Sequence, residues 1–114
     1  MLVYDFPFEH AAYAKVTRAT PPVAERFELI IDGMEIANGF HEVTAPAEQA
    51  ARHARENALR RARNLPEMTI DHTLSAALDA GLPPCAGVAL GLDRLLMVLE
   101  QCVEIEHVVA FGRG

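Results

Sequence analysis

The chain has 114 residues, a length that fits one domain with a modest hydrophobic core. Hydrophobic residues make up 51% of it, yet no apolar run approaches the roughly 18 residues of a membrane span, which excludes a transmembrane protein. The net charge of −6 argues against a general affinity for nucleic acid, because such binding depends on cationic side chains that neutralise phosphates.

The two cysteines, Cys85 and Cys102, have no spacing that matches a metal site. Free thiols are typical of a reducing compartment. The first residues show no charged segment followed by an apolar one, the pattern of a secretory leader. We therefore expect a cytoplasmic protein.

The first half of the chain predicts three strands. Residues 1–7 are apolar and rich in β-formers, and Pro7 ends the segment. Residues 8–22 have no clear period and predict a loop with a short helical turn. Residues 23–31 predict a second strand, and the Asp32-Gly33 pair is a strong hairpin signal that returns the chain as a third strand over 34–40.

The returning strand carries three polar side chains, Glu35, Asn38 and Glu42, in an otherwise apolar run. Regular alternation would place Glu35 and Glu42 on opposite faces of the sheet. A shared site therefore requires a bulge or turn between them, and Asn38-Gly39 supplies residues that tolerate one. Two such carboxylates suit Mg²⁺. The residues alone favour an edge strand with solvated glutamates over such a site.

Two helices are predicted next. Thr44 is expected to cap the first, with Pro46 in its first turn and an end near Asn64. Asp71 is expected to cap a short second helix over 74–80. The first helix carries half of the basic residues, which form either a solvated face or a patch for an acidic partner: Arg52, Arg55, Arg60, Arg61 and Arg63.

The final predicted elements form a strand–helix corner. Residues 87–91 are small and apolar, the pattern of a buried strand, and Asp93 is expected to cap the helix that follows. Arg94 falls in the first turn, where a cation opposes the helix dipole, so we expect an anionic partner. That partner is either a phosphate, which an arginine beside Gly91 is well placed to grip, or an internal carboxylate. Residues 103–111 predict a last extended segment packed on the core.

Two stretches resemble a known family. GVALGLDRLLM resembles the third signature motif of class II aminoacyl-tRNA synthetases, and ERFELIIDGMEIANGFHEVTAPAEQ is similar to the preceding segment of the lysyl-tRNA synthetase group. Within this group, the chain is most similar to the truncated branch that attaches β-lysine to elongation factor P. The similarity lies in the segments ANGFHEV and PPCAGVALGLDRL and in a C-terminal tail that lacks FPxxRP. The resemblance runs from about Phe6 to the end of the chain.

The resemblance implies an α+β fold, an antiparallel sheet with flanking helices. Residues 1–114 would be the C-terminal portion of a class II catalytic domain, with the third motif at about 87–99 and the first and second motifs absent from this chain. It also implies a homodimeric parent, and we expect the 114 residues alone to be catalytically inert.

The implied activity is an ATP-dependent ligase that activates lysine or β-lysine as its adenylate. The acceptor would be a lysine of elongation factor P in the truncated branch, or tRNA in a true synthetase. A module that kept the fold but lost catalysis is the alternative from another functional class.

The resemblance also assigns residues. Glu35 and Arg94 match catalytic positions, and they match ATP-binding positions together with Ile36 and Gly91. Glu35 would hold the Mg²⁺ of ATP, and Arg94 would steady its terminal phosphates. Glu42 would contact the amino-acid substrate or a second metal, and Asn38 would line the substrate pocket.

Overall fold

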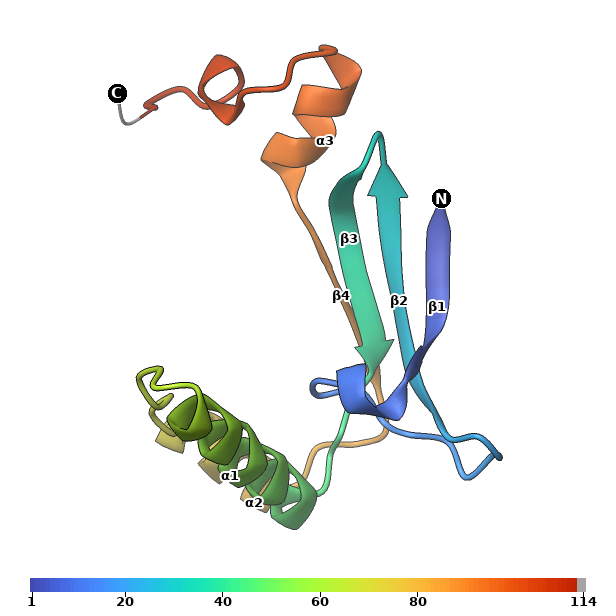
Figure 1. Ribbon diagram of the computed structural model, residues 1–114, viewed down its shortest axis with the longest axis vertical. Coiled ribbons are helices and arrows are strands. Elements are labelled where there is room, and N and C mark those ends of the chain that lie inside the picture. The colour runs from blue at the N-terminus through green and yellow to red at the C-terminus, as the bar shows by residue number, and fades with distance from the viewer. Residues whose placement is uncertain (113–114) are drawn as a thin grey trace.

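The computed structural model describes residues 1–112, and within them four strands form one antiparallel sheet in the order β1-β2-β3-β4 (Figure 1). The strands are β1 (Leu2–Pro7), β2 (Val23–Ile31), β3 (Met34–His41) and β4 (Ala86–Leu90). The helices are α1 (Pro46–Ala62), α2 (His72–Ala80) and α3 (Leu92–Leu99), with 3-10 turns η1 (Phe8–His10) and η2 (Ile105–His107). The predicted α+β architecture is confirmed.

The predicted hairpin joins β2 and β3. Its turn residues, Asp32 and Gly33, have φ angles of 51° and 78°, the left-handed values that a tight hairpin turn requires. Leu29 pairs with Ala37, but its neighbour Ile30 pairs with Glu35, so β3 carries one extra residue in between. The expected bulge therefore exists, but the prediction that Asn38-Gly39 forms it was wrong.

Gly39 has a different role from the one expected. It lies in the regular ladder directly opposite Phe27, whose aromatic ring covers it. A Cβ atom at Gly39 would lie 2.6 Å from Cε1 of Phe27 and 2.9 Å from the carbonyl oxygen of Gly87. The glycine is thus needed for the close approach of a ring and a neighbouring strand.

Helix α2 (His72–Ala80) has the predicted capping residues, although it begins two residues before the predicted start, and α1 lacks its predicted cap. The Asp71 carboxylate accepts hydrogen bonds from the backbone N–H groups of Thr73 (2.8 Å) and Leu74 (3.1 Å), and Gly81 ends the helix at φ 101°. Helix α1 begins at Pro46 with Ala45 as its cap residue and no side-chain cap, so the prediction for Thr44 was wrong. Proline at the first position needs no N–H partner, which reduces what a cap contributes there.

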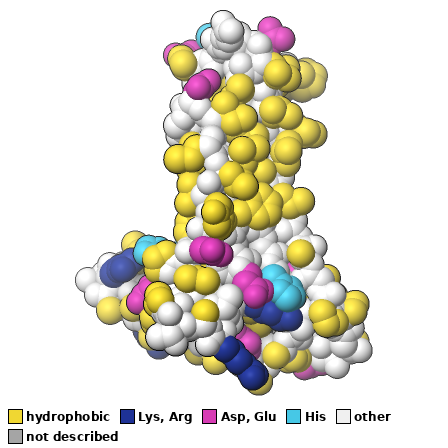
Figure 2. Space-filling model, turned by 90° about the vertical axis from the view of Figure 1, so that its right-hand side faces the viewer, with side chains coloured by type: hydrophobic (Ala, Val, Ile, Leu, Met, Phe, Trp, Pro, Cys, Tyr) yellow, Lys and Arg dark blue, Asp and Glu magenta, His cyan; other side chains and the backbone are white. Residues whose placement is uncertain are grey.

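Strand β4 and helix α3 are far more exposed than predicted. Val88 of β4 is 66% exposed and Leu92 of α3 is 74% exposed, although the small apolar pattern predicts a buried strand. Figure 2 shows hydrophobic side chains gathered over the part of the molecule where the sheet and α3 lie. Gly91, and not Asp93, occupies the cap position of α3. The segment expected to pack on the core contains the turn η2, and Phe111 is 96% exposed.

The buried core is correspondingly small. Ala11, Ala14 and Ala24 form its central cluster, with Phe6 and Phe40 packed against it. None of the helices in the described part of the chain has the length and hydrophobicity needed to cross a bilayer.

We expect Gly39→Ala to destabilise the fold by about 1–3 kcal/mol, because the new methyl group meets both an aromatic ring and a backbone oxygen. Urea denaturation measures the change. Gly112→Ala is the matched control, since a Cβ there meets nothing closer than 3.5 Å. Equal stability of the two variants would contradict this account of Gly39.

Candidate functional site

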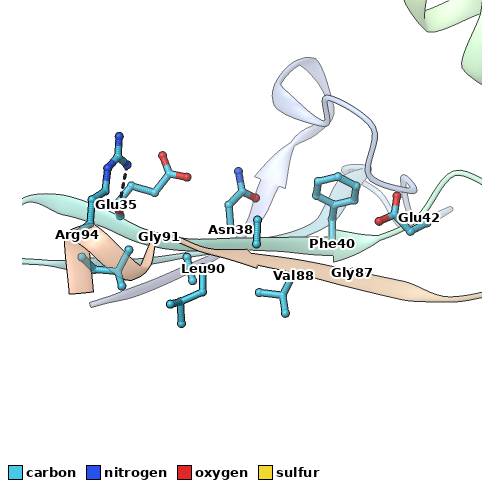
Figure 3. A pocket seen from close by; sticks show the side chains of 12 residues that line it. Glu35, Asn38, Phe40, Glu42, Gly87, Val88, Leu90, Gly91 and Arg94 are labelled. Atoms are coloured by element: carbon cyan, nitrogen blue, oxygen red, sulfur yellow. Dashed lines mark hydrogen bonds between the residues drawn. The ribbon is translucent and has the colours of Figure 1, made fainter. Parts of the chain in front are cut away.

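A cavity of about 600 Å³ lies over β3 and β4 at their junction with α3. The six residues singled out from the sequence all line it: Glu35, Ile36, Asn38, Glu42, Gly91 and Arg94. Figure 3 shows the polar members on one side of the two strands, whereas Val88 and Leu90 point to the other side. The structure therefore brings the predicted residues to one cavity.

The bulge in β3 is what places Glu35 in this cavity. Alternation along a regular strand would send Glu35 to the face opposite Asn38. Because Ile36 is inserted into the ladder, Glu35 instead shares the face of Asn38 and Phe40 (Figure 3). Ile36 itself is 2% exposed, so its side chain anchors the bulge in the interior.

The corner between β4 and α3 holds the bulge in place. The backbone N–H of Gly91 donates to the carbonyl oxygen of Ile36 at 2.9 Å, and Nη1 of Arg94 donates to the carbonyl oxygen of Glu35 at 2.8 Å. The carbonyl groups of Glu35 and Ile36 are therefore both hydrogen-bonded to the same corner.

Arg94 keeps most of its hydrogen-bonding capacity. It is exposed, and none of the ion pairs among residues 1–112 includes it, so the alternative of an internal carboxylate partner was wrong. Its one bond goes to a neutral carbonyl group, whereas a guanidinium has five N–H donors. The remaining donors and the full positive charge are available to an anionic ligand.

The two glutamates lie at opposite ends of the cavity. Glu35 is beside Arg94, and Glu42 lies beyond Phe40 at the far end of β3 (Figure 3). The strand between them is about 20 Å long at roughly 3.3 Å per residue. Ligands of one Mg²⁺ each sit about 2.1 Å from the ion, so this strand cannot bring Glu35 and Glu42 to the same ion. Residues 1–112 contain no cluster of three or more His, Cys, Asp or Glu side chains suited to a metal.

Small residues of β4 open the floor of the cavity. Ala89 lies opposite Asn38 and Gly87 lies opposite Phe40, on the same face of the sheet. A Cβ atom at Gly87 would come within 2.5 Å of Oε1 of Glu42. The glycine thus leaves the space that the half-buried Glu42 carboxylate occupies.

Two further polar residues on this face were missed from the sequence. Glu28 lies directly opposite Asn38, and Nε of Arg26 donates to Oδ1 of Asn38 at 3.3 Å. The available signal was alternation: if Phe27 and Leu29 share one face of β2, Arg26 and Glu28 share the other. His41 points out of the opposite face, where its ring contacts Glu25 (2.5 Å) and Lys15 (3.1 Å), outside the cavity.

The arginines of α1 mainly bind the chain itself. Arg52 donates to the carbonyl oxygens of Ala12 and Ala14, and Arg60 donates to that of Pro66. Arg61 pairs with Glu67 at 3.0 Å. These contacts attach loops to the helix, and they engage three of the five arginines of the predicted basic patch.

Comparison with known proteins identifies the family. The family model described as tRNA synthetases class II (D, K and N) matches residues 1–114. The chain belongs to the class II tRNA synthetase family. This membership confirms the resemblance that rests on the motifs around Glu35 and Arg94.

Three curated relatives of this class II chain carry the name elongation factor P–(R)-β-lysine ligase. Those of Vibrio cholerae and Vibrio vulnificus are 55% and 50% identical over 109 residues, and that of Mannheimia succiniciproducens is 50% identical over 111 residues. The matches cover 96%, 96% and 97% of this chain, but 34% of each relative. This chain therefore spans about a third of the length of the curated relatives it matches.

We expect Gly87→Ala to displace the Glu42 carboxylate while changing stability by less than about 1 kcal/mol, because the atom in the way is the tip of a flexible side chain. A crystal structure of the variant and its thermal unfolding measure the two effects. An unmoved Glu42 carboxylate would contradict this view of the cavity floor.

Proposed function

We propose that this chain is the C-terminal part of the catalytic domain of an ATP-dependent ligase that activates lysine or β-lysine and transfers it to a lysine of elongation factor P. The carrying observation is the division of the cavity, with a guanidinium and a carboxylate at one end and a second carboxylate at the other. The names of relatives at 50–55% identity support the choice of acceptor.

The end formed by Arg94 and Glu35 suits the triphosphate. In the proposed reaction an oxygen of the substrate carboxylate attacks the α-phosphorus, and the bond to the departing pyrophosphate breaks. Arg94, with its free N–H donors, would bind the terminal phosphate oxygens. Gly91 leaves the corner open for the adenosine, and the backbone of Ile36 lies beside it.

The donor set at this end fits magnesium. Mg²⁺ in nucleotide sites is held by one or two carboxylates together with phosphate oxygens, and the exposed Glu35 carboxylate supplies one such ligand. When bound, the ion would neutralise charge that develops on the phosphates. We assign the predicted metal role to Glu35, and Glu42 stands too far along β3 to share that ion.

The other end suits the amine of the substrate. Glu42 is half-buried, and none of the ion pairs within residues 1–112 includes it, so a substrate ammonium group would be its natural partner. Asn38 lies between the two ends and would contact the intervening part of the substrate. An amine at Glu42 directs the carboxylate toward the nucleotide.

In the second step the amine of the acceptor would attack the acyl carbon of the adenylate, which releases AMP. A protein acceptor agrees with the net charge of −6 and with α1 arginines that bind the chain's own loops. A homodimeric, cytoplasmic parent remains part of this proposal, and the free thiols of Cys85 and Cys102 are typical of such a location.

The acceptor assay tests the proposal. The full-length parent is incubated with ATP and labelled lysine or β-lysine, with elongation factor P in one reaction and tRNA in another. We expect label on elongation factor P. Label on tRNA would establish a lysyl-tRNA synthetase instead, and no amino-acid-dependent exchange between ATP and pyrophosphate would indicate a module that has lost catalysis.

We expect Glu35→Gln and Arg94→Met in the parent each to lower kcat/KM in the exchange assay by about 10- to 1000-fold, because the first removes the charge that would hold Mg²⁺ and the second removes the charge that would bind the phosphates. Arg61→Met is the matched control, since Arg61 is an exposed arginine paired with Glu67 away from the cavity. Unchanged turnover in both site variants would refute the assignment of this end to ATP.

A further inference from the structure

Arg26 lies next to the cavity without lining it, and all parts of its guanidinium group have partners within the chain. Its Nη1 donates to the carbonyl oxygen of His10 at 2.9 Å, and Nη2 pairs with the Glu28 carboxylate. The guanidinium carbon lies 4.6 Å from the centre of the Phe6 ring. The side chain is only 16% exposed. Contacts to β1, η1 and β2 therefore fix the guanidinium before any ligand binds.

The remaining N–H of this guanidinium decides how the Asn38 amide is oriented. Nε of Arg26 donates to Asn38 at 3.3 Å. An arginine has donors and no acceptor, so the atom of Asn38 that faces it must be the oxygen. The amide nitrogen is therefore turned outward, and Figure 3 shows it as the atom of Asn38 farthest from the sheet. Without Arg26 this constraint on the amide is lost, and the Glu28 carboxylate opposite Asn38 can instead accept from the amide nitrogen.

This orientation gives the middle of the cavity a hydrogen-bond donor. A ligand group at that point must therefore be an acceptor, such as a carboxylate or carbonyl oxygen. In the proposed reaction one carboxylate oxygen attacks phosphorus and the other becomes the carbonyl oxygen of the adenylate. The second oxygen stays an acceptor throughout, so the same N–H can hold it before and after the bond forms.

We propose that Arg26 is a positioning residue that fixes the Asn38 amide with its nitrogen toward the cavity, where it binds the non-attacking carboxylate oxygen of the amino-acid substrate. The inference rests on the function proposed above. It adds a residue that acts on the substrate only through Asn38.

The test uses amino-acid-dependent exchange between ATP and pyrophosphate in the full-length parent. We expect Arg26→Met to raise KM for the amino acid about tenfold, the effect of one lost hydrogen bond, and to leave KM for ATP within about twofold. Arg52→Met is the matched control, because Arg52 is similarly buried (19% exposed) and also binds backbone carbonyl oxygens and a glutamate. A purely structural role for Arg26 predicts the same kinetics for both variants.

A double-mutant cycle separates action through Asn38 from any other effect. In an Asn38→Ala background, Arg26→Met should change KM for the amino acid by less than about twofold. Asn38→Asp should raise KM as much as Asn38→Ala, because it keeps an acceptor for Arg26 but removes the donor from the cavity. If Arg26→Met does not fold, Arg26→Lys takes its place, since a lysine cannot reproduce the Nε bond while it pairs with Glu28.

Each outcome has one meaning. An undiminished effect of Arg26→Met in the Asn38→Ala background, or wild-type KM in Asn38→Asp, would overturn the inference. If Asn38→Ala raises KM and the Arg26 variants do not, the inference fails while the proposed function stands. If the wild-type parent exchanges with neither lysine nor β-lysine, the proposed function fails first.

Discussion

Two hydrogen bonds tie the bulge of β3 to the corner between β4 and α3, and the candidate site depends on them. They run from the Gly91 N–H to the Ile36 carbonyl and from the Arg94 side chain to the Glu35 carbonyl. A bulge disrupts the ladder locally, and backbone groups left without a partner are costly when buried. The corner satisfies both carbonyl groups, and the same contacts place Glu35 beside Arg94.

The sheet consequently has two chemically different faces. One carries the polar cavity, from Arg94 at one end to Glu42 at the other, over a floor kept open by Gly87 and Ala89. The other is apolar around Val88 and Leu90, which are exposed in these 112 described residues. A substrate that spans the polar face would meet charged side chains at both ends and the neutral amide of Asn38 between them. That layout suits a molecule with an amine at one end and a reacting carboxylate at the other.

Much of this architecture follows from local signals. The Asp32-Gly33 hairpin and the Asp71 cap of α2 are set by short-range chemistry, and both are present. Alternation correctly required a bulge between Glu35 and Glu42. Glycine and asparagine occur for several structural reasons besides bulges, so the prediction placed the bulge at Asn38-Gly39 and not at Ile36. Gly39 serves a close contact with Phe27 instead. The role of Arg26 depends on pairing across strands, which only the register reveals.

Burial was the least predictable property. The small apolar residues of β4 indicate a strand that something covers, but a pattern within one segment does not say which other segment supplies the cover. The caps expected at Thr44 and Asp93 failed for a related reason, since Pro46 and Gly91 already fix where α1 and α3 begin.

A crystal structure of the full-length parent with an ATP analogue, Mg²⁺ and β-lysine tests the central claim most directly. The account predicts a bulge still held by Gly91 and Arg94, a Glu35 carboxylate about 2.1 Å from the ion, and the substrate amine at Glu42. A nucleotide bound on the face of Val88 and Leu90, or a Glu35 side chain turned to that face, would contradict it.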